Sequence, residues 1–177
     1  MKASVYIATS LDGFIARSSG DLDWLGKSSE EGEEDYGYKE FMDTVDVLVM
    51  GRNTYDKVLT FGQWPYGSKP VVVLSSRSLR IPGRIAECVE TMSCAPAELV
   101  GRLAKRGAKH LYVDGGRTIQ SFLDAGLIQR LIITRIPVLI GSGISLFGPI
   151  QRDIKLRHIE TRRFSGGLEQ SVYEVVA

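Results

Sequence analysis

The sequence lacks the features that mark membrane, secreted and metal-scaffold proteins. No stretch approaches the ~18 continuous apolar residues that a membrane span needs. The opening MKASVYIATSLDGFIA carries Asp12 within an alternating pattern, and not a basic start followed by an apolar run. The two cysteines, Cys88 and Cys94, do not stand in a metal-ligand spacing with the two histidines. We therefore expect no signal peptide, no disulfide scaffold and no metal site, and a cytoplasmic protein with reduced thiols.

An excess of either charge is also missing. Lys and Arg number 22 and Asp and Glu 21, so the net charge is +1. Such a balance provides no general attraction to nucleic acid or to an anionic membrane. The remaining composition, 44% hydrophobic and 24% charged over 177 residues, is that of an ordinary globular protein. We expect one domain, spanning residues 1–177, that buries roughly 70% of the surface its unfolded chain exposes.

Short apolar or alternating runs, bounded by Gly, Pro or charge, recur along the chain and predict strands. They cover residues 4–9, 45–50, 70–74, 85–89, 110–113, 131–136, 155–164 and 168–176. Helical patterns lie between the first six, at residues 34–44, 54–59, 96–106 and 118–125. Alternation of strand and helix predicts a mainly parallel sheet covered by helices. The last two strands, joined by Ser165-Gly166-Gly167, predict an antiparallel hairpin at the end of the chain.

Three junctions at the ends of predicted strands carry residues suited to anions. Residues 50–54 read MGRNT, residues 74–77 read LSSR, and residues 114–118 read DGGRT. Glycine lets a ligand approach the backbone, a helix start offers free N–H groups, and arginine adds a charged fork. Each junction taken alone is more often a structural turn. Together they place three anion sites at the carboxyl ends of strands, where open α/β sheets bind ligands, although no GxGxxG or Walker pattern is present.

The same segments resemble a known superfamily. VLVMGRNTYD, VVVLSSR and VDGGRTIQSFL resemble, in the same order, the three cofactor-binding segments of dihydrofolate reductases, and RLIITRI with PVLIGSGISLFG resembles the next strand and loop. IATSLDGFIA and GDLDWL resemble more closely the reductase domain of bacterial riboflavin biosynthesis proteins, the RibD C-terminal domain. The matching segments lie within residues 5–147. The resemblance implies the dihydrofolate reductase-like three-layer α/β/α fold, with about eight strands and about four helices.

The resemblance also implies NADPH as the cofactor, and two arginines beside a pair of hydroxyls agree with a phosphorylated dinucleotide. The residues that it assigns to the 2′-phosphate are Arg52, Ser75, Ser76 and Arg77. Those assigned to the pyrophosphate are Asn53 and Thr54 at one helix start and Gly116, Arg117, Thr118 and Ile119 at the other, and Gly51 is assigned to the cofactor as a whole. Those assigned to the nicotinamide are Ala8, Ile15 and Gly115.

Dihydrofolate reductases use a buried acid on the first helix, fifteen positions before the Met of MGR, which here is Asp35. An acid in an apolar cleft can bind a heterocycle and assist its protonation as hydride arrives. Thr134 matches the threonine that supports this acid. Glu34 is the alternative candidate for this acid. In a purely structural interpretation, Asp35 is a solvated charge within the acidic run at residues 30–35.

The sequence departs from the riboflavin-pathway reductases at one motif, because residues 54–59 read TYDKVL where those proteins carry paired aspartates. The leading hypothesis is still an NADPH-dependent reductase of a pyrimidine or pterin-type heterocycle, with 5-amino-6-(5-phosphoribosylamino)uracil reductase and dihydrofolate reductase as the nearest activities. A non-catalytic NADPH-binding sensor and a purely structural dimer built through the terminal hairpin are the other classes. The resemblance also implies a homodimer.

Overall fold

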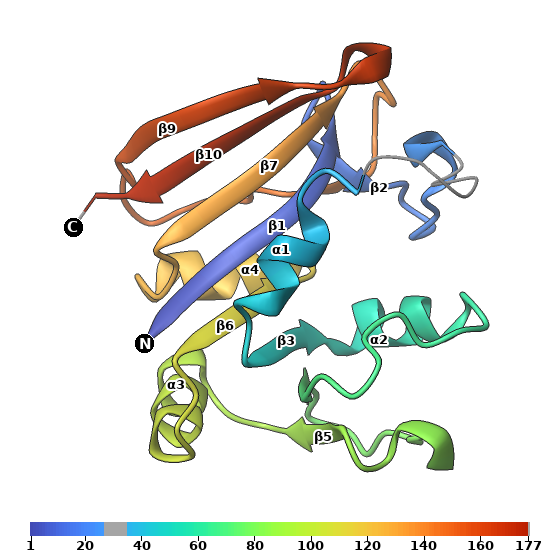
Figure 1. The fold of residues 1–177 in the computed structure, drawn as a ribbon, viewed down its shortest axis with the longest axis vertical. Helices are drawn as coiled ribbons and strands as arrows, with labels where there is room; N and C mark the ends of the chain where they lie inside the picture. Colours follow the sequence, from blue (N-terminus) through green and yellow to red (C-terminus); the bar gives the residue numbers. More distant parts are fainter. Residues whose placement is uncertain (27–34, 177) are drawn as a thin grey trace.

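An eight-stranded sheet forms the centre of the computed structural model, which describes residues 1–26 and 35–176 (Figure 1). The strand order is β5-β4-β3-β6-β1-β7-β10-β9. The strands are β1 (Lys2–Ser10), β3 (Val47–Gly51), β4 (Val71–Leu74), β5 (Val89–Met92), β6 (His110–Asp114), β7 (Arg130–Ile136), β9 (Leu156–Arg163) and β10 (Glu169–Val175). The neighbours from β5 to β7 pair in parallel, whereas β10 pairs antiparallel with both β7 and β9. The predicted parallel sheet and terminal hairpin are therefore confirmed.

Four helices cover the two faces of the sheet, and each follows or precedes a strand of the parallel part. They are α1 (Tyr38–Asp43), α2 (Arg52–Leu59), α3 (Pro96–Lys105) and α4 (Gly116–Asp124). Phe41 of α1 and Tyr55 of α2 pack into one buried cluster, and the apolar residues of α3 and α4 pack into the other. In Figure 1, α1 lies in front of β1 and α4 lies behind it. The layers are thus α/β/α, as expected.

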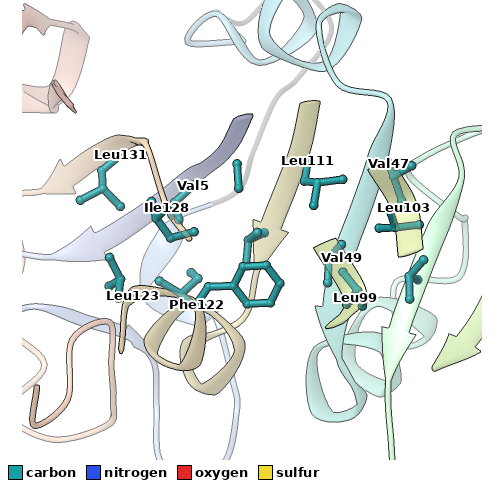
Figure 2. Packing of buried hydrophobic residues seen from close by; sticks show 14 of the residues in the cluster. Val5, Val47, Val49, Leu99, Leu103, Leu111, Phe122, Leu123, Ile128 and Leu131 are labelled. Atoms are coloured by element: carbon teal, nitrogen blue, oxygen red, sulfur yellow. The ribbon is translucent and has the colours of Figure 1, made fainter. Parts of the chain in front are cut away.

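The buried cluster under α3 and α4 explains why the sequences of the parallel strands are continuous apolar runs. Leu99 and Leu103 of α3 lie beside Val47 and Val49 of β3, and Phe122 of α4 is completely buried (Figure 2). Helices cover both faces of the parallel strands, so the side chains on both faces are buried away from water. Burying each such side chain contributes on the order of 1.5–3 kcal/mol.

Two predicted elements have different bounds in the structure. A strand was expected at residues 85–89, but Gly83–Ile85 forms a 3-10 turn (η2) after Pro82, and β5 begins only at Val89. A helix was expected from residue 34, but α1 begins at Tyr38. Tyr36 and Gly37 have φ values of 55° and 81°, which lie outside the right-handed helical region. The helix therefore cannot extend back through them.

A small ribbon was not predicted. It pairs β2 (Phe14–Ala16) antiparallel with β8 (Ile144–Ser145). Both strands are too short to produce a hydrophobic period. Two further 3-10 turns, η1 (Asp23–Leu25) and η3 (Ser165–Gly167), complete the elements, and η3 forms the loop of the terminal hairpin. Among the described helices, none has both the length and the apolar character needed to cross a bilayer.

Candidate active site

The candidate site lies at the carboxyl ends of two neighbouring parallel strands that are followed by helices on opposite faces of the sheet. β3 continues into α2 on one face, and β6 continues into α4 on the other. The two strands are paired, with Met50 opposite Asp114 at their carboxyl ends. An open α/β sheet has its ligand crevice at such a switch point. The first and third of the predicted anion junctions are thereby brought together.

Two glycines and two threonines interlock the helix starts. A Cβ placed on Gly51 would lie 2.8 Å from Thr118 Oγ1, and one on Gly115 would lie 2.3 Å from Thr54 Oγ1. Each helix start thus places a threonine against the glycine of the other junction. Gly115 also has a φ of 92°, which favours glycine. These glycines are required by the packing of the two junctions, and this packing sets the N-termini of α2 and α4 side by side.

The predicted 2′-phosphate residues lie on adjacent strand ends. Gly51 pairs with Leu74, so Arg52 and Ser75 follow neighbouring positions of β3 and β4. The Arg52 guanidinium forms an exposed ion pair with Asp56, at 3.4 Å. Ser75 Oγ donates to the Arg77 carbonyl at 2.7 Å and accepts from the Arg77 N–H at 3.2 Å. This hydroxyl closes a turn, while the exposed Arg77 side chain makes no ion pair among the described residues.

The start of α4 offers fewer free amides than the sequence suggested. The N–H of Ile119 already donates to the Gly115 carbonyl at 2.8 Å, and the Ile119 side chain is fully buried in the core. Ile119 is therefore not available to a ligand, because both its amide and its side chain are occupied. The first turn from Gly116 to Thr118 keeps the free N–H groups of a helix N-terminus.

The β2–β8 ribbon covers this turn. A Cβ on Gly116 would lie 3.1 Å from Ile15 Cδ1 and 3.2 Å from the carbonyl oxygen of Ser145. Ile15, predicted near the nicotinamide, is therefore next to Gly116. Ala8, also predicted near the nicotinamide, lies on β1 directly opposite Thr134 of β7.

The ribbon is held in place by Asp12, which follows β1. Asp12 Oδ1 accepts from Ser10 Oγ at 2.6 Å, and its carboxylate also accepts the N–H groups of Ile140 (3.3 Å) and Gly141 (2.8 Å). These hydrogen bonds, led by the one from Ser10, hold the pKa of Asp12 below its ordinary value. Asp12 thus joins the end of β1 to the loop that leads into β8.

The acid of the site is Asp114, a half-buried residue at the end of β6, which the sequence analysis placed in a glycine turn and did not single out. Burial raises the pKa of Asp114 to about 6, although one oxygen accepts the Gly115 N–H at 2.8 Å. The signal in the sequence was an acid that directly ends an apolar strand and precedes two glycines. A carboxyl group with such a pKa is suited to proton transfer near neutral pH.

Tyrosines gather around this acid on the α1/α2 face of the sheet. The pKa values of Tyr38, Tyr66 and Tyr112 are all raised, first by burial and then by the charge of Asp114. Tyr66 packs edge-on against Trp64, with ring centroids 5.1 Å apart. Trp64 and Tyr66 therefore belong to a packed aromatic loop on the same face of the sheet as the acid.

Asp35 has a setting different from the expected one. It is exposed, and its carboxylate accepts the backbone N–H groups of Gly37 at 2.9 Å and Lys39 at 3.0 Å. These two bonds hold its pKa below the ordinary value. The prediction that Asp35 lies in an apolar cleft was wrong, because its oxygens are used to begin α1. Glu34 lies outside the described residues.

Thr134 is connected to the start of α1 through a glutamine. Gln170 Nε2 donates to Thr134 Oγ1 at 3.0 Å, to the Tyr6 hydroxyl at 3.1 Å and to the Tyr36 carbonyl at 3.1 Å. The Tyr6 hydroxyl donates to the same carbonyl at 2.8 Å. Thr134 therefore supports the backbone beside Asp35 and makes no direct bond to its carboxylate among the described contacts.

Comparison with known proteins places the chain in a family. The model of the RibD C-terminal domain matches residues 2–169, so the chain belongs to the RibD C-terminal domain family, as its motifs indicated. It is 36% identical to YwjB of Bacillus subtilis over 171 residues, which are 95% of each chain. It is 26% identical to riboflavin biosynthesis protein RibD of Corynebacterium ammoniagenes, over 84% of this chain and 47% of that one.

Solved structures agree on the fold. A protein of Shewanella sp. PV-4 superposes with a TM-score of 0.93 and 40% identity over the whole of both chains. The deaminase/5-amino-6-(5-phosphoribosylamino)uracil reductase of Thermotoga maritima gives a TM-score of 0.70 at 17% identity, over 99% of this chain and 56% of that one. Dihydrofolate reductase of Enterococcus faecalis, solved with NADP(H), gives 0.67 at 17% identity, over 98% and 96% of the two chains. The fold is therefore dihydrofolate reductase-like.

Proposed function

We propose that the protein is an NADPH-dependent reductase of a pyrimidine or pterin-type heterocycle, with 5-amino-6-(5-phosphoribosylamino)uracil reductase-like activity as the first candidate. The observation that carries the proposal is Asp114, a desolvated acid at the switch point between β3 and β6. Hydride transfer to a heterocycle leaves a nitrogen or oxygen that needs a proton. A carboxyl group with a pKa of about 6 can hold that proton close to neutral pH.

The residues around the switch point fit a phosphorylated dinucleotide. The adjacent N-termini of α2 and α4 suit a pyrophosphate, because each offers free N–H groups and partial positive charge. Arg52 and Arg77, with Ser75 and Ser76, provide charge and hydroxyl groups for a 2′-phosphate at the neighbouring strand ends. NADPH, when bound, supplies the hydride. In the proposal Ala8, Ile15 and Gly115 border its nicotinamide.

The side chains beside Asp114 favour a flat, polar ring as the substrate. Tyr38 and Tyr66 present phenol groups around the carboxyl, and aromatic rings stack well on planar heterocycles. Two relatives are named for riboflavin biosynthesis and for uracil reduction, which agrees with an aminopyrimidine. Asp114 binds the exchangeable edge of this ring in the proposal and delivers the proton as hydride arrives.

Dihydrofolate reductase activity is the second candidate, because the fold is shared with the enzyme of E. faecalis. It ranks lower because the Asp35 carboxylate is exposed and engaged in starting α1. A non-catalytic NADPH-binding protein would use the same helix starts without needing the acid.

The test is NADPH oxidation, followed by absorbance, with the ribosylaminouracil or dihydrofolate as the second substrate. We expect oxidation with the ribosylaminouracil, at least 100-fold slower in Asp114→Asn, which is the lower end of the usual contribution of general acid catalysis. Asp124→Asn, an exposed acid at the end of α4, is the matched control and should keep the wild-type rate. Oxidation with dihydrofolate alone would select the second candidate. Tight NADPH binding without oxidation of either substrate would select the binding protein.

The proposal also includes a cytoplasmic homodimer. An exposed edge strand, β9, and the uncovered face beside it leave surface for a second copy. Sedimentation velocity of the purified protein tests the assembly, and a single species of the monomer mass, 19.5 kDa, at micromolar concentration would contradict it.

A further inference from the structure

A cavity lies between α1 and the sheet, away from the switch point. It has a volume of about 200 Å³ and is bounded by α1 and the residues on either side of it, and by β1, β6, β7, β9 and β10 of the sheet. Its lining begins at Lys2, the first residue of β1, whereas the candidate active site is at the carboxyl ends of the strands. Residues assigned to the cofactor do not appear in its wall. Gln170 lines the cavity and donates a hydrogen bond to Thr134. Thr134 is paired with Ala8 in the sheet, so these two residues lie between the cavity and Ala8.

Two cations converge on the wall of this cavity. Arg130 pairs with Ser4 in the sheet, and Lys2 precedes Ser4 by two positions on the same strand face. Within the described residues, neither cation forms an ion pair within 4.0 Å. The pKa of Lys2 is below its ordinary value, first because of burial and then because of Arg130. Arg130 Nε is buried without a hydrogen-bond partner in the described chain.

Nearby carboxylates are only partly available to these cations. Glu174 is opposite Arg130 in the sheet, and its charge partly offsets the lowering of the Lys2 pKa, but its oxygen is hydrogen-bonded to Arg157 at 2.5 Å. Glu160 on the cavity wall is bonded to Arg162 at 3.1 Å. Glu40 is the remaining carboxylate of the described lining. Placing like charges together with a buried, unbonded N–H group costs free energy. An anion with oxygen acceptors removes both costs.

The rest of the cavity suits an organic body. Phe41 of α1, Ile132 of β7 and Val172 of β10 provide apolar surface in its wall. A water molecule occupies roughly 30 Å³ of liquid, so the cavity is larger than a bare inorganic anion needs. The shape and chemistry match a ring or short chain that carries one anionic group.

We propose that this cavity binds a small organic anion, with its phosphoryl or carboxylate group at Lys2 and Arg130 and its apolar body on Phe41, Ile132 and Val172. Lysine supplies a point charge and arginine a planar fork, a combination that suits phosphoryl and carboxylate oxygens. The site is separate from the proposed reductase site and does not depend on that function.

The test is isothermal titration of the whole protein, at constant ionic strength, with phenyl phosphate, benzoate, inorganic phosphate and phenol. We expect phenyl phosphate or benzoate to bind, and whichever binds more tightly identifies the anionic group. Inorganic phosphate should bind at least fivefold more weakly than phenyl phosphate, and phenol should not bind measurably. Arg130→Gln and Lys2→Gln should each weaken binding of the aromatic anion at least tenfold, with thermal unfolding showing that each variant is folded.

Two controls separate this site from the cofactor site. Arg102→Gln, an exposed position on α3, should leave binding unchanged. The double variant Arg52→Ala, Arg77→Ala should also leave it unchanged, whereas loss of binding there would assign the anion to the cofactor residues and overturn the proposal. The absence of binding at millimolar anion, or equal binding of phenol, would overturn it too. So would a dimer that dissociates in Arg130→Gln, because the cavity would then be an interface between copies.

Discussion

At the scale of single residues, Asp114 makes a contribution to stability whose pH dependence is opposite in sign to that of the carboxylates with lowered pKa, such as Asp12 and Asp35. Its pKa is about 6 in the folded chain, against ~3.9 for an unperturbed aspartate. Because the folded state disfavours the charged form, the contribution of Asp114 to the free energy of unfolding should fall as pH rises from about 4 to about 6 and then level off. Folding is therefore helped by a protonated Asp114 below this range.

The substitution Asp114→Asn should remove this dependence, since the amide keeps the size of the side chain and carries no charge. We expect the variant to be more stable than the wild type at pH 8 and equal to it at pH 4, as measured by urea unfolding. An unchanged pH dependence in the variant would show that another group is responsible.

Asp114 and Asp35 also show where a motif can mislead. The position of Asp35 was inferred by counting from MGR, and the count is correct, but two left-handed residues at Tyr36 and Gly37 begin the helix later and turn the carboxylate to the backbone. Sequence spacing does not report such backbone angles. Asp114 could be read as part of a turn, and only the burial around it reveals an acid of unusual pKa.

If catalysis depends on Asp114, the rate should show an inflection near pH 6 that disappears in Asp114→Asn, while Asp35→Asn keeps the inflection and most of the rate. The measurement is the pH profile of NADPH oxidation for the three proteins. If the inflection disappears in Asp35→Asn and remains in Asp114→Asn, the acid that controls the rate is Asp35 and not Asp114.

At the scale of elements, the contacts between the two strand-to-helix junctions make a sharp prediction. Gly51→Ala would bring a methyl group to 2.8 Å from Thr118 Oγ1. We expect this crowding to lower the free energy of unfolding by about 1–3 kcal/mol, a usual cost of overpacking. Thr118→Ala should restore part of the loss in the double variant, because it removes the atom that is contacted.

Chemical unfolding of the wild type, the two single variants and the double variant measures this coupling. Gly101→Ala, an exposed glycine of α3 with open space around it, is the control and should not destabilise the protein. Additive effects of Gly51→Ala and Thr118→Ala would mean that the junctions do not interlock.

The Asp12 contacts make a second prediction at this scale. Asp12→Ala removes the acceptor of the Ile140 and Gly141 N–H groups, so the β2–β8 ribbon should become looser over Gly116. We expect several-fold weaker NADPH binding and faster hydrogen exchange at residues 140–141, while Asp124→Ala should match the wild type. Unchanged exchange in Asp12→Ala would show that the carboxylate does not hold the loop.

The sequence predicted those helices and strands in which buried, apolar residues recur in a regular pattern. The parallel strands were found because both of their faces are buried, and the terminal hairpin because its glycine loop separates two alternating runs. The β2–β8 ribbon was missed because β2 has three residues and β8 has two, and strands this short show no alternating apolar pattern. The error at η2 has a similar cause, because Ile85 is buried in a turn as deeply as a strand residue would be.

At the scale of the whole molecule, the order of the strands explains what the separate motifs could not. Each motif alone described one turn at the end of one strand. Only the pairing of β3 with β6, followed by helices on opposite faces, places the starts of α2 and α4 next to each other and next to Asp114. We propose that these helix starts bind a dinucleotide carrying a 2′-phosphate, and that the charges of Arg52 and Arg77 select it.

The most direct measurement is therefore titration of the purified protein with NADPH and with NADH, in the wild type and in the Arg52→Ala, Arg77→Ala variant. We predict that the wild type binds NADPH at least tenfold more tightly than NADH, and that the variant loses this preference while it still binds both weakly through the helix starts. Equal affinities in the wild type, or no binding of either nucleotide at millimolar concentration, would contradict the account.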